Sequence, residues 1–185
     1  MTTQLSFLLR GIRADDWTRP TPCDDWDVRA LVDHIVGGNW FTINILAGTT
    51  AEDALASTMA DFADGVPTAD QAALSMTEQL HAFQQPGIAE RTLHHVAGDL
   101  EGRHVLRLRL HDLIVHSWDL ARSFDPSFVL PNELADWGLH ELADPSSSAV
   151  EHFMVSPQTG SGSSEAAARY LQVFGRSAGP ERGFS

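Results

Sequence analysis

The chain has 185 residues, in which 25 aspartates and glutamates outnumber 12 basic residues, and its formal net charge is −13. All the basic residues are arginines, so no lysine is present to form a Schiff base, hold pyridoxal phosphate or complete a phosphate-binding loop. The acidic excess also argues against nucleic acid and anionic membranes as partners, because binding to either depends on clustered cations.

The length and a hydrophobic fraction of 43% predict one domain over residues 1–185 with a core of its own. Cys23 is the sole cysteine, which excludes an internal disulfide and a cysteine-based zinc cluster and fits a reducing cytoplasm. The N-terminus lacks a charged leader segment, and no apolar run approaches the ~18 residues that span a membrane. We therefore expect a cytoplasmic protein without a membrane partner.

An apolar stripe at helical spacing marks the first predicted helix, with Leu5, Leu8, Leu9 and Ile12. Pro20 and Pro22 follow, and the helix is expected to end before them. Asp27 is the predicted N-cap of a second helix, which stops at Gly48 and is apolar over most of its circumference. Such a helix is expected to lie at the centre of the fold.

The remaining chain continues to favour helices over strands. Further helices are predicted over 51–62, 68–84, 103–123, 132–143 and 165–174, and an extended segment over 92–96. The helix over 103–123 is strongly apolar, with Leu106, Leu110, Leu113 and Leu120 on one side. A Pro/Gly/Ser-rich run over 156–164 is interpreted as a loop. We predict an all-α fold, a four-helix bundle with additional short helices.

Nine histidines are present, and several of them follow a carboxylate by three or four residues. Four such pairs are Asp112/His116, Asp136/His140, Glu78/His81 and Glu101/His104. On a helix such side chains have Cβ atoms ~5–6 Å apart and can converge on one ion. Most such pairs bind nothing and form hydrogen bonds or ion pairs in solvent. Their surroundings must therefore decide between them.

Asp112 and His116 differ from the other pairs because leucines and isoleucines flank them, which indicates a largely buried helix. They lie about 40° apart on the helical wheel, at the rim of the core, where a carboxylate needs an imidazole or a metal as its partner. His34, in the other apolar helix, is either a core histidine satisfied by a backbone carbonyl or the third member of a two-histidine, one-carboxylate metal site. Gly37 and Gly38, one turn later, favour either room for a ligand or close helix packing.

Two longer motifs contain these positions: Trp17-x3-Thr21-Pro-Cys23-x2-Trp26-x-Val28-Arg-x-Leu31-Val-x-His34 and Asp112-x3-His116-x-Trp118-Asp119-Leu-Ala-Arg122. Together with the closing Phe174-Gly-Arg176, they resemble the DinB-like metal-binding proteins. The branch that they resemble most is the one related to the N-terminal domain of mycothiol-dependent maleylpyruvate isomerase. The resemblance implies a single DinB-like domain over 1–185, in which His34, Asp112 and His116 hold a divalent ion. This donor set suits Zn first, with Ni and Fe(II) as alternatives.

Two departures from the isomerase limit what is carried over. The isomerase has Glu where this chain has Asp112, so the carboxylate reaches roughly 1.5 Å less far. It also carries a further C-terminal domain that contributes to its active site, and this chain ends at Ser185 without one. Maleylpyruvate isomerisation itself is therefore not expected.

Three functions are compatible with such a site. The resemblance implies a low-molecular-weight thiol such as mycothiol, which would bind the ion as a thiolate and attack a small electrophilic substrate in a transfer or isomerisation. The alternatives are a metal-dependent hydrolase and a noncatalytic protein that binds a metal or a small molecule. Arg109 is a candidate anchor for an anionic substrate, with an ion pair to Asp112 as its alternative role. Asp119 either orients a ligand histidine or lies in solvent, and the large apolar helices make a homodimer reasonable.

Overall fold

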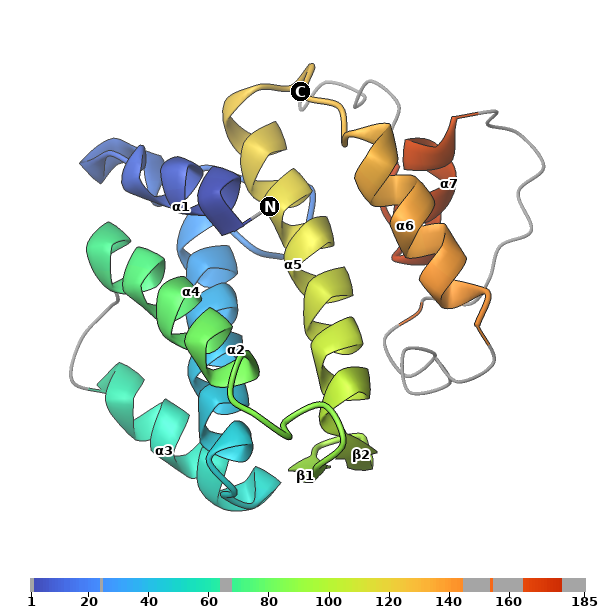
Figure 1. The fold of residues 1–185 in the computed structure, drawn as a ribbon. Helices are drawn as coiled ribbons and strands as arrows, with labels where there is room; N and C mark the ends of the chain where they lie inside the picture. The colour runs from blue at the N-terminus through green and yellow to red at the C-terminus, as the bar shows by residue number, and fades with distance from the viewer. Residues whose placement is uncertain (1, 24, 64–67, 145–153, 155–164, 178–185) are drawn as a thin grey trace.

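The computed structural model describes residues 2–23, 25–63, 68–144, 154 and 165–177, and Figure 1 shows its helical fold. The elements in chain order are α1 (Thr2–Arg10), a 3-10 turn η1 (Ala14–Asp16), α2 (Val28–Leu46), α3 (Ala51–Ala63), α4 (Ala69–Phe83), β1 (Thr92–His95), β2 (Gly98–Glu101), α5 (Gly102–Phe124), α6 (Asn132–Leu142) and α7 (Ala166–Val173). The predicted all-α, DinB-like class is confirmed. The loop predicted over 156–164 lies outside the described residues.

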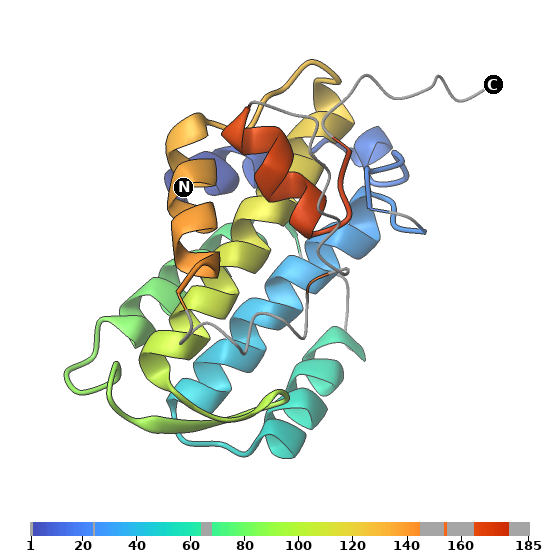
Figure 2. The ribbon, with the colours of Figure 1, turned by 90° about the vertical axis from the view of Figure 1, so that its right-hand side faces the viewer.

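The two longest helices, α2 and α5, run side by side through the middle of the molecule (Figure 2). The carboxylate of Asp27 accepts a 2.8 Å hydrogen bond from the backbone N–H of Ala30, so it caps α2 as predicted. Gly48 follows the helix with φ of +102°, a conformation that glycine adopts without strain. Helices α1, α3 and α4 lie on one side of this pair and α6 and α7 on the other (Figure 1).

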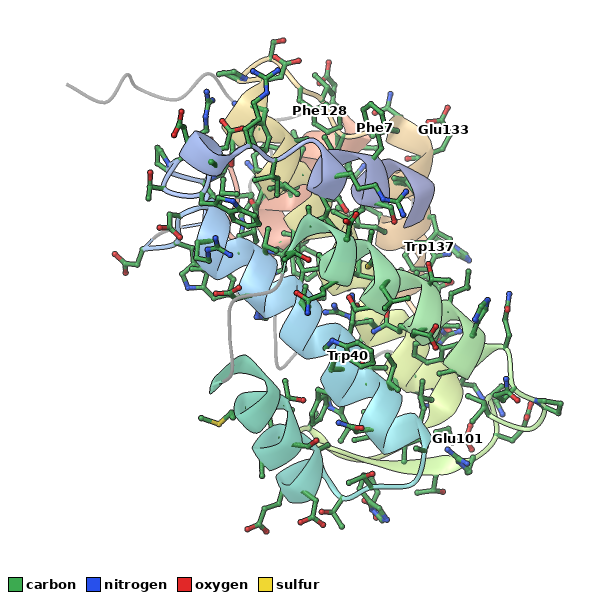
Figure 3. The ribbon with its side chains drawn as sticks, turned by 90° about the vertical axis from the view of Figure 1, so that its left-hand side faces the viewer. Phe7, Trp40, Glu101, Phe128, Glu133 and Trp137 are labelled. Atoms are coloured by element: carbon green, nitrogen blue, oxygen red, sulfur yellow. The ribbon has the colours of Figure 1, made fainter. Side chains whose placement is uncertain are left out.

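Three apolar clusters join these layers. The first lies between α1, α2, α4 and α5 and contains Leu5, Leu9, Leu31, Val32, Ile35, Val36, Met76, Leu113 and Leu120. Trp40 packs against it from α2, where α3 and α4 flank that helix (Figure 3). The second joins α5 to α6 and α7 and contains Leu108, Ile114, Val115, Trp118, Leu130, Ala135, Ala167, Tyr170, Leu171 and Phe174. The third, at the hairpin end, contains Phe41, Ile45, Leu46, Ala54, Ile88, Leu93 and Val105. Together these clusters fix α2 and α5 from both sides.

The extended segment predicted over 92–96 is β1, and it pairs antiparallel with β2, which was not predicted. The β2 sequence, Gly-Asp-Leu-Glu, contains no β-branched or aromatic residue that would mark a strand. One detail of the α5 prediction is wrong: Leu106 is 37% exposed and lies off the buried stripe. Val105 and Leu108 form the buried face at that end of the helix instead.

Gly138 allows α6 and α7 to approach closely. A Cβ atom added to it would lie 2.2 Å from Cε2 of Tyr170, a side chain with no exposed surface.

No helix in the described part of the chain is both long enough and apolar enough to span a bilayer.

Candidate metal centre

The structure brings the three predicted ligands together where α2 faces α5. His34, Asp112 and His116 are called the triad below. Nε2 of His34 lies 3.1 Å from Oδ1 of Asp112, and Nε2 of His116 lies 3.3 Å from the same oxygen. One donor atom from each residue lies within 4.8 Å of the other two. The predicted juxtaposition of His34 with the α5 pair is therefore confirmed.

Two of the three donor–donor separations are those expected around a first-row metal ion, and all three donors lie within 4.8 Å of one another. Donors at bond lengths of ~2.0–2.1 Å around a tetrahedral ion are separated by roughly 3.3 Å. The two distances from Oδ1 of Asp112, 3.1 and 3.3 Å, match that separation. Because two imidazoles and one carboxylate provide only three donors, such an ion retains open positions for other ligands.

The indole of Trp26, just before α2, lies against both imidazoles. Its ring centroid is 4.8 Å from that of His34 and 5.7 Å from that of His116, and the two imidazole centroids are 4.7 Å apart. Trp26 therefore limits how far either imidazole can rotate. Nothing in the sequence spacing of Trp26 indicates this contact with His116.

The second oxygen of Asp112 is occupied by Arg109. Nη1 of the guanidinium donates to Oδ2 of Asp112, and Nη2 donates to the Ile35 carbonyl at 2.6 Å and to Oδ1 of Asn39 at 2.7 Å. Arg109 is only 7% exposed. The ion pair that we gave as the alternative role of Arg109 is therefore present, and the substrate-anchoring role stays a prediction.

Asp119 holds the far side of the His116 imidazole. Nδ1 of His116 lies 3.0 Å from Oδ2 of Asp119, whose side chain is fully buried. Arg176, after α7, donates to the same carboxylate from Nε at 3.1 Å and from Nη2 at 2.8 Å. Of the two alternatives for Asp119, the structure shows the orienting contact and excludes solvent exposure. Sequence reasoning gave Arg176 no role, since 57 positions separate it from Asp119.

These contacts set the charge states of the site. Burial would raise the pKa of Asp112, but the Arg109 charge and hydrogen bonds with His116 and His34 hold that pKa well below its usual range. Burial would lower the pKa of His116, but Asp112 and Asp119 outweigh it and raise that pKa to about 9. A pKa of about 9 favours the imidazolium form of His116 at neutral pH, so any metal ion bound at its Nε2 would have to displace a proton.

The three side chains open into a cavity of about 600 Å³, a volume typical of small-molecule sites. Its walls are mostly apolar, and they include Phe41, Leu55, Val96, Val105, Leu108, Val115 and Phe174. Gly37, Gly38 and Cys23 also line it, together with the imidazoles of His95 and His111. Gly37 and Gly38 therefore both line the cavity, and at Gly38 the space that a Cβ would fill is taken by the guanidinium of Arg109.

The other carboxylate–histidine pairs do not assemble into comparable sites. Within the described ranges, His34, Asp112 and His116 form the one group of three or more metal-ligating side chains that is close enough to hold an ion. The pairs Asp136/His140, Glu78/His81 and Glu101/His104 belong to no such group. Surroundings, and not spacing, separated the first pair from these.

The chain matches a known protein family over the helices that carry His34, Asp112 and His116. The model of the mycothiol maleylpyruvate isomerase N-terminal domain matches residues 1–121. Two uncharacterized proteins of Mycobacterium tuberculosis, MT0763 of strain CDC 1551 / Oshkosh and Rv0738 of strain ATCC 25618 / H37Rv, are each 34% identical over 128 residues. The match covers 69% of this chain and 65% of either relative, slightly less than two thirds of their length. No solved structure matches the chain significantly.

Proposed function

We propose that this chain, which belongs to the mycothiol maleylpyruvate isomerase N-terminal domain family, binds a divalent metal ion through His34, Asp112 and His116. We further propose that it uses the ion in thiol-dependent transfer or isomerisation on small electrophilic substrates. The observation that carries the proposal is the convergence of two imidazole nitrogens, from two helices, on one carboxylate oxygen. Zn is the first expectation, with Ni and Fe(II) as alternatives.

The contacts behind His116 support the same role. A metal-ligating histidine usually donates its other ring N–H to a carboxylate or carbonyl, which fixes the tautomer and orients the ligand nitrogen. In this structure the carboxylate of Asp119 is the hydrogen-bond partner of Nδ1 of His116, and this contact directs Nε2 toward Asp112. Nη2 of Arg176 lies 2.8 Å from Oδ2 of Asp119, and this ion pair offsets part of the cost of burying that carboxylate.

The cavity supports a reaction with a small molecule. A divalent ion, when bound, lowers the pKa of a thiol ligand and so supplies a thiolate at neutral pH. The largely apolar walls suit the apolar part of a small electrophile, and the indole of Trp26 lies against the two imidazoles. Mycothiol is the thiol that the family implies, and we propose it as the co-substrate.

Metal content tests the first part of the proposal. The protein would be purified without a metal-affinity column and its metal content measured by elemental analysis, beside the variants His116→Ala and His140→Ala. His140 is an exposed histidine four residues after a carboxylate, so it is a matched control. We expect about one ion per chain in the wild type and in His140→Ala, and loss of that ion in His116→Ala. Unchanged stoichiometric metal in His116→Ala would refute the assignment.

Conjugation of a model electrophile tests the second part. We expect consumption of the electrophile to require both mycothiol and the metal, and to cease when a chelator is added. Chelator-sensitive hydrolysis without a thiol would instead identify a hydrolase, and metal binding with neither activity would identify a noncatalytic binding protein.

A further inference from the structure

A buried polar network extends from α4 to the candidate metal centre. Oγ of Ser75 accepts a 2.8 Å hydrogen bond from Nδ2 of Asn39, and Oδ1 of Asn39 accepts one from Arg109. Ser75 and Asn39 have no exposed surface, and Arg109 has 7%. The network ends at Asp112, the one carboxylate of the triad. Three helices, α2, α4 and α5, therefore share in fixing the position of the Arg109 guanidinium.

Gly38 creates the space in which that guanidinium lies. A Cβ atom at this position would be 2.5 Å from Nη1 of Arg109 and 2.9 Å from its Cζ. Any side chain at this position would displace the guanidinium from Asp112. The glycine thus serves the Arg109 position as well as leaving room in the cavity.

The two carboxylate oxygens of Asp112 have different partners. Oδ2 faces Nη1 of Arg109, whereas Oδ1 faces both imidazoles. Because Arg109 is held by two further acceptors, the Ile35 carbonyl and Asn39, it cannot follow the carboxylate if that side chain turns. A carboxylate in this setting has only one oxygen to offer an ion.

We propose that Arg109 is a positioning residue that restricts Asp112 to one-oxygen coordination of the metal. The proposal rests on the proposed function, since it requires that the triad binds an ion. Its consequence is a site with three protein donors, two of them nitrogens, which favours Zn over ions that prefer many oxygen ligands. A carboxylate free to bind through both oxygens would fill one of the positions that a thiol and a substrate need.

The test compares metal coordination in four proteins: the wild type, Arg109→Met, Gly38→Ala and Arg107→Met. Arg107 is on the same helix and pairs with Glu141 and Asp144, outside the metal-ligating group, so its variant is a matched control for the loss of a partly buried arginine. Each metal-free protein is titrated with Co²⁺, whose visible absorption is stronger at lower coordination number, and the dissociation constants of Zn²⁺ and Mn²⁺ are measured by competition.

We expect the Co²⁺ absorption to fall in Arg109→Met and in Gly38→Ala, because Asp112 then coordinates through both oxygens. We also expect the ratio of the Mn²⁺ to the Zn²⁺ dissociation constant to fall about tenfold in both variants. The same ratio is expected to stay unchanged in Arg107→Met. If Arg109→Met does not fold, Arg109→Lys, which keeps the charge without the fork of donors, is expected to show the same two changes.

A Co²⁺ spectrum and metal preference equal to those of the wild type, in folded Arg109→Met or Arg109→Lys, would overturn the positioning role. In that case the wild type would still bind Co²⁺ and lose it on His116→Ala, so the metal site itself would stand. A wild type that binds no Co²⁺ would overturn the proposed function and the positioning role with it.

Discussion

Replacing Gly138 with alanine is expected to destabilise the protein, although alanine is the better helix former. The added Cβ would lie 2.2 Å from Cε2 of Tyr170, so the ring has to retreat by about 1.2 Å to reach an ordinary contact. Tyr170 is fully buried, and its hydroxyl is 2.8 Å from Nδ1 of His111. A ring that retreats loses this hydrogen bond and disturbs the packing between α6 and α7.

The magnitude follows from three contributions. Overpacking costs about 1–3 kcal/mol, and the lost hydrogen bond about 1 kcal/mol. The helix propensity of alanine returns about 1 kcal/mol. We therefore expect Gly138→Ala to lower the free energy of unfolding by about 2 kcal/mol, or the melting temperature by roughly 4–8 °C in a chain of this size.

Urea unfolding followed by circular dichroism measures the effect, and Tyr170→Phe completes a double-mutant cycle. In the wild type, removing the hydroxyl is expected to cost about 1 kcal/mol, and in Gly138→Ala nearly nothing, because the hydrogen bond to His111 is already lost. A Gly138→Ala protein as stable as the wild type, or more stable, would refute the close packing described for α6 and α7.

Three further predictions concern the cavity and the metal site. Burial lowers the pKa of His95, so the folded protein binds that proton less readily than the unfolded chain. The contribution of His95 to the free energy of unfolding is constant above about pH 7 and becomes less favourable below about pH 6.5. His95→Asn is therefore expected to lose less stability than the wild type between pH 7 and 5 in urea unfolding. Arg176→Leu leaves the carboxylate of Asp119 buried without its arginine, so we expect a loss of about 3–5 kcal/mol in the free energy of unfolding. Zn²⁺ binding, measured by competition titration, is expected to be roughly tenfold weaker, because Asp119 orients His116. A Zn²⁺ affinity equal to that of the wild type would contradict this link to His116. Excess Zn²⁺ at about 100 times its dissociation constant is expected to raise the unfolding free energy of the wild type by about 2.7 kcal/mol, and a His34→Ala protein that gains as much would show that the ion binds elsewhere.

The helices and the triad were predictable because each depends on local pattern. Apolar periodicity marked α2 and α5, and Asp27 marked the start of α2. Two polar side chains on one apolar helix, and a histidine on another, indicate a site as soon as the two helices are neighbours. The resemblance to a known family supplied that neighbourhood, which periodicity alone does not contain.

The contacts around the triad were less predictable because they join residues far apart in the chain. The position of Asp119 one turn after His116 was visible in the sequence, but its full burial depends on packing that only the structure shows. Arg176 reaches that carboxylate because α6 and α7 fold back beside α5. The buried position of the Arg109 guanidinium depends on the absence of a side chain at Gly38. Strand β2 was missed because its residues carry no strand preference.

The link between Arg176 and Asp119 matters for anyone who expresses part of this protein. The family match stops at residue 121, inside α5, so a shortened polypeptide ending there would retain every candidate ligand. It would nevertheless lack the arginine that pairs with Asp119, and would expose Trp118, which packs in the apolar cluster that joins α5 to α6 and α7. Weak metal binding by such a fragment would reflect the missing residues through 176, and not a defect in the triad.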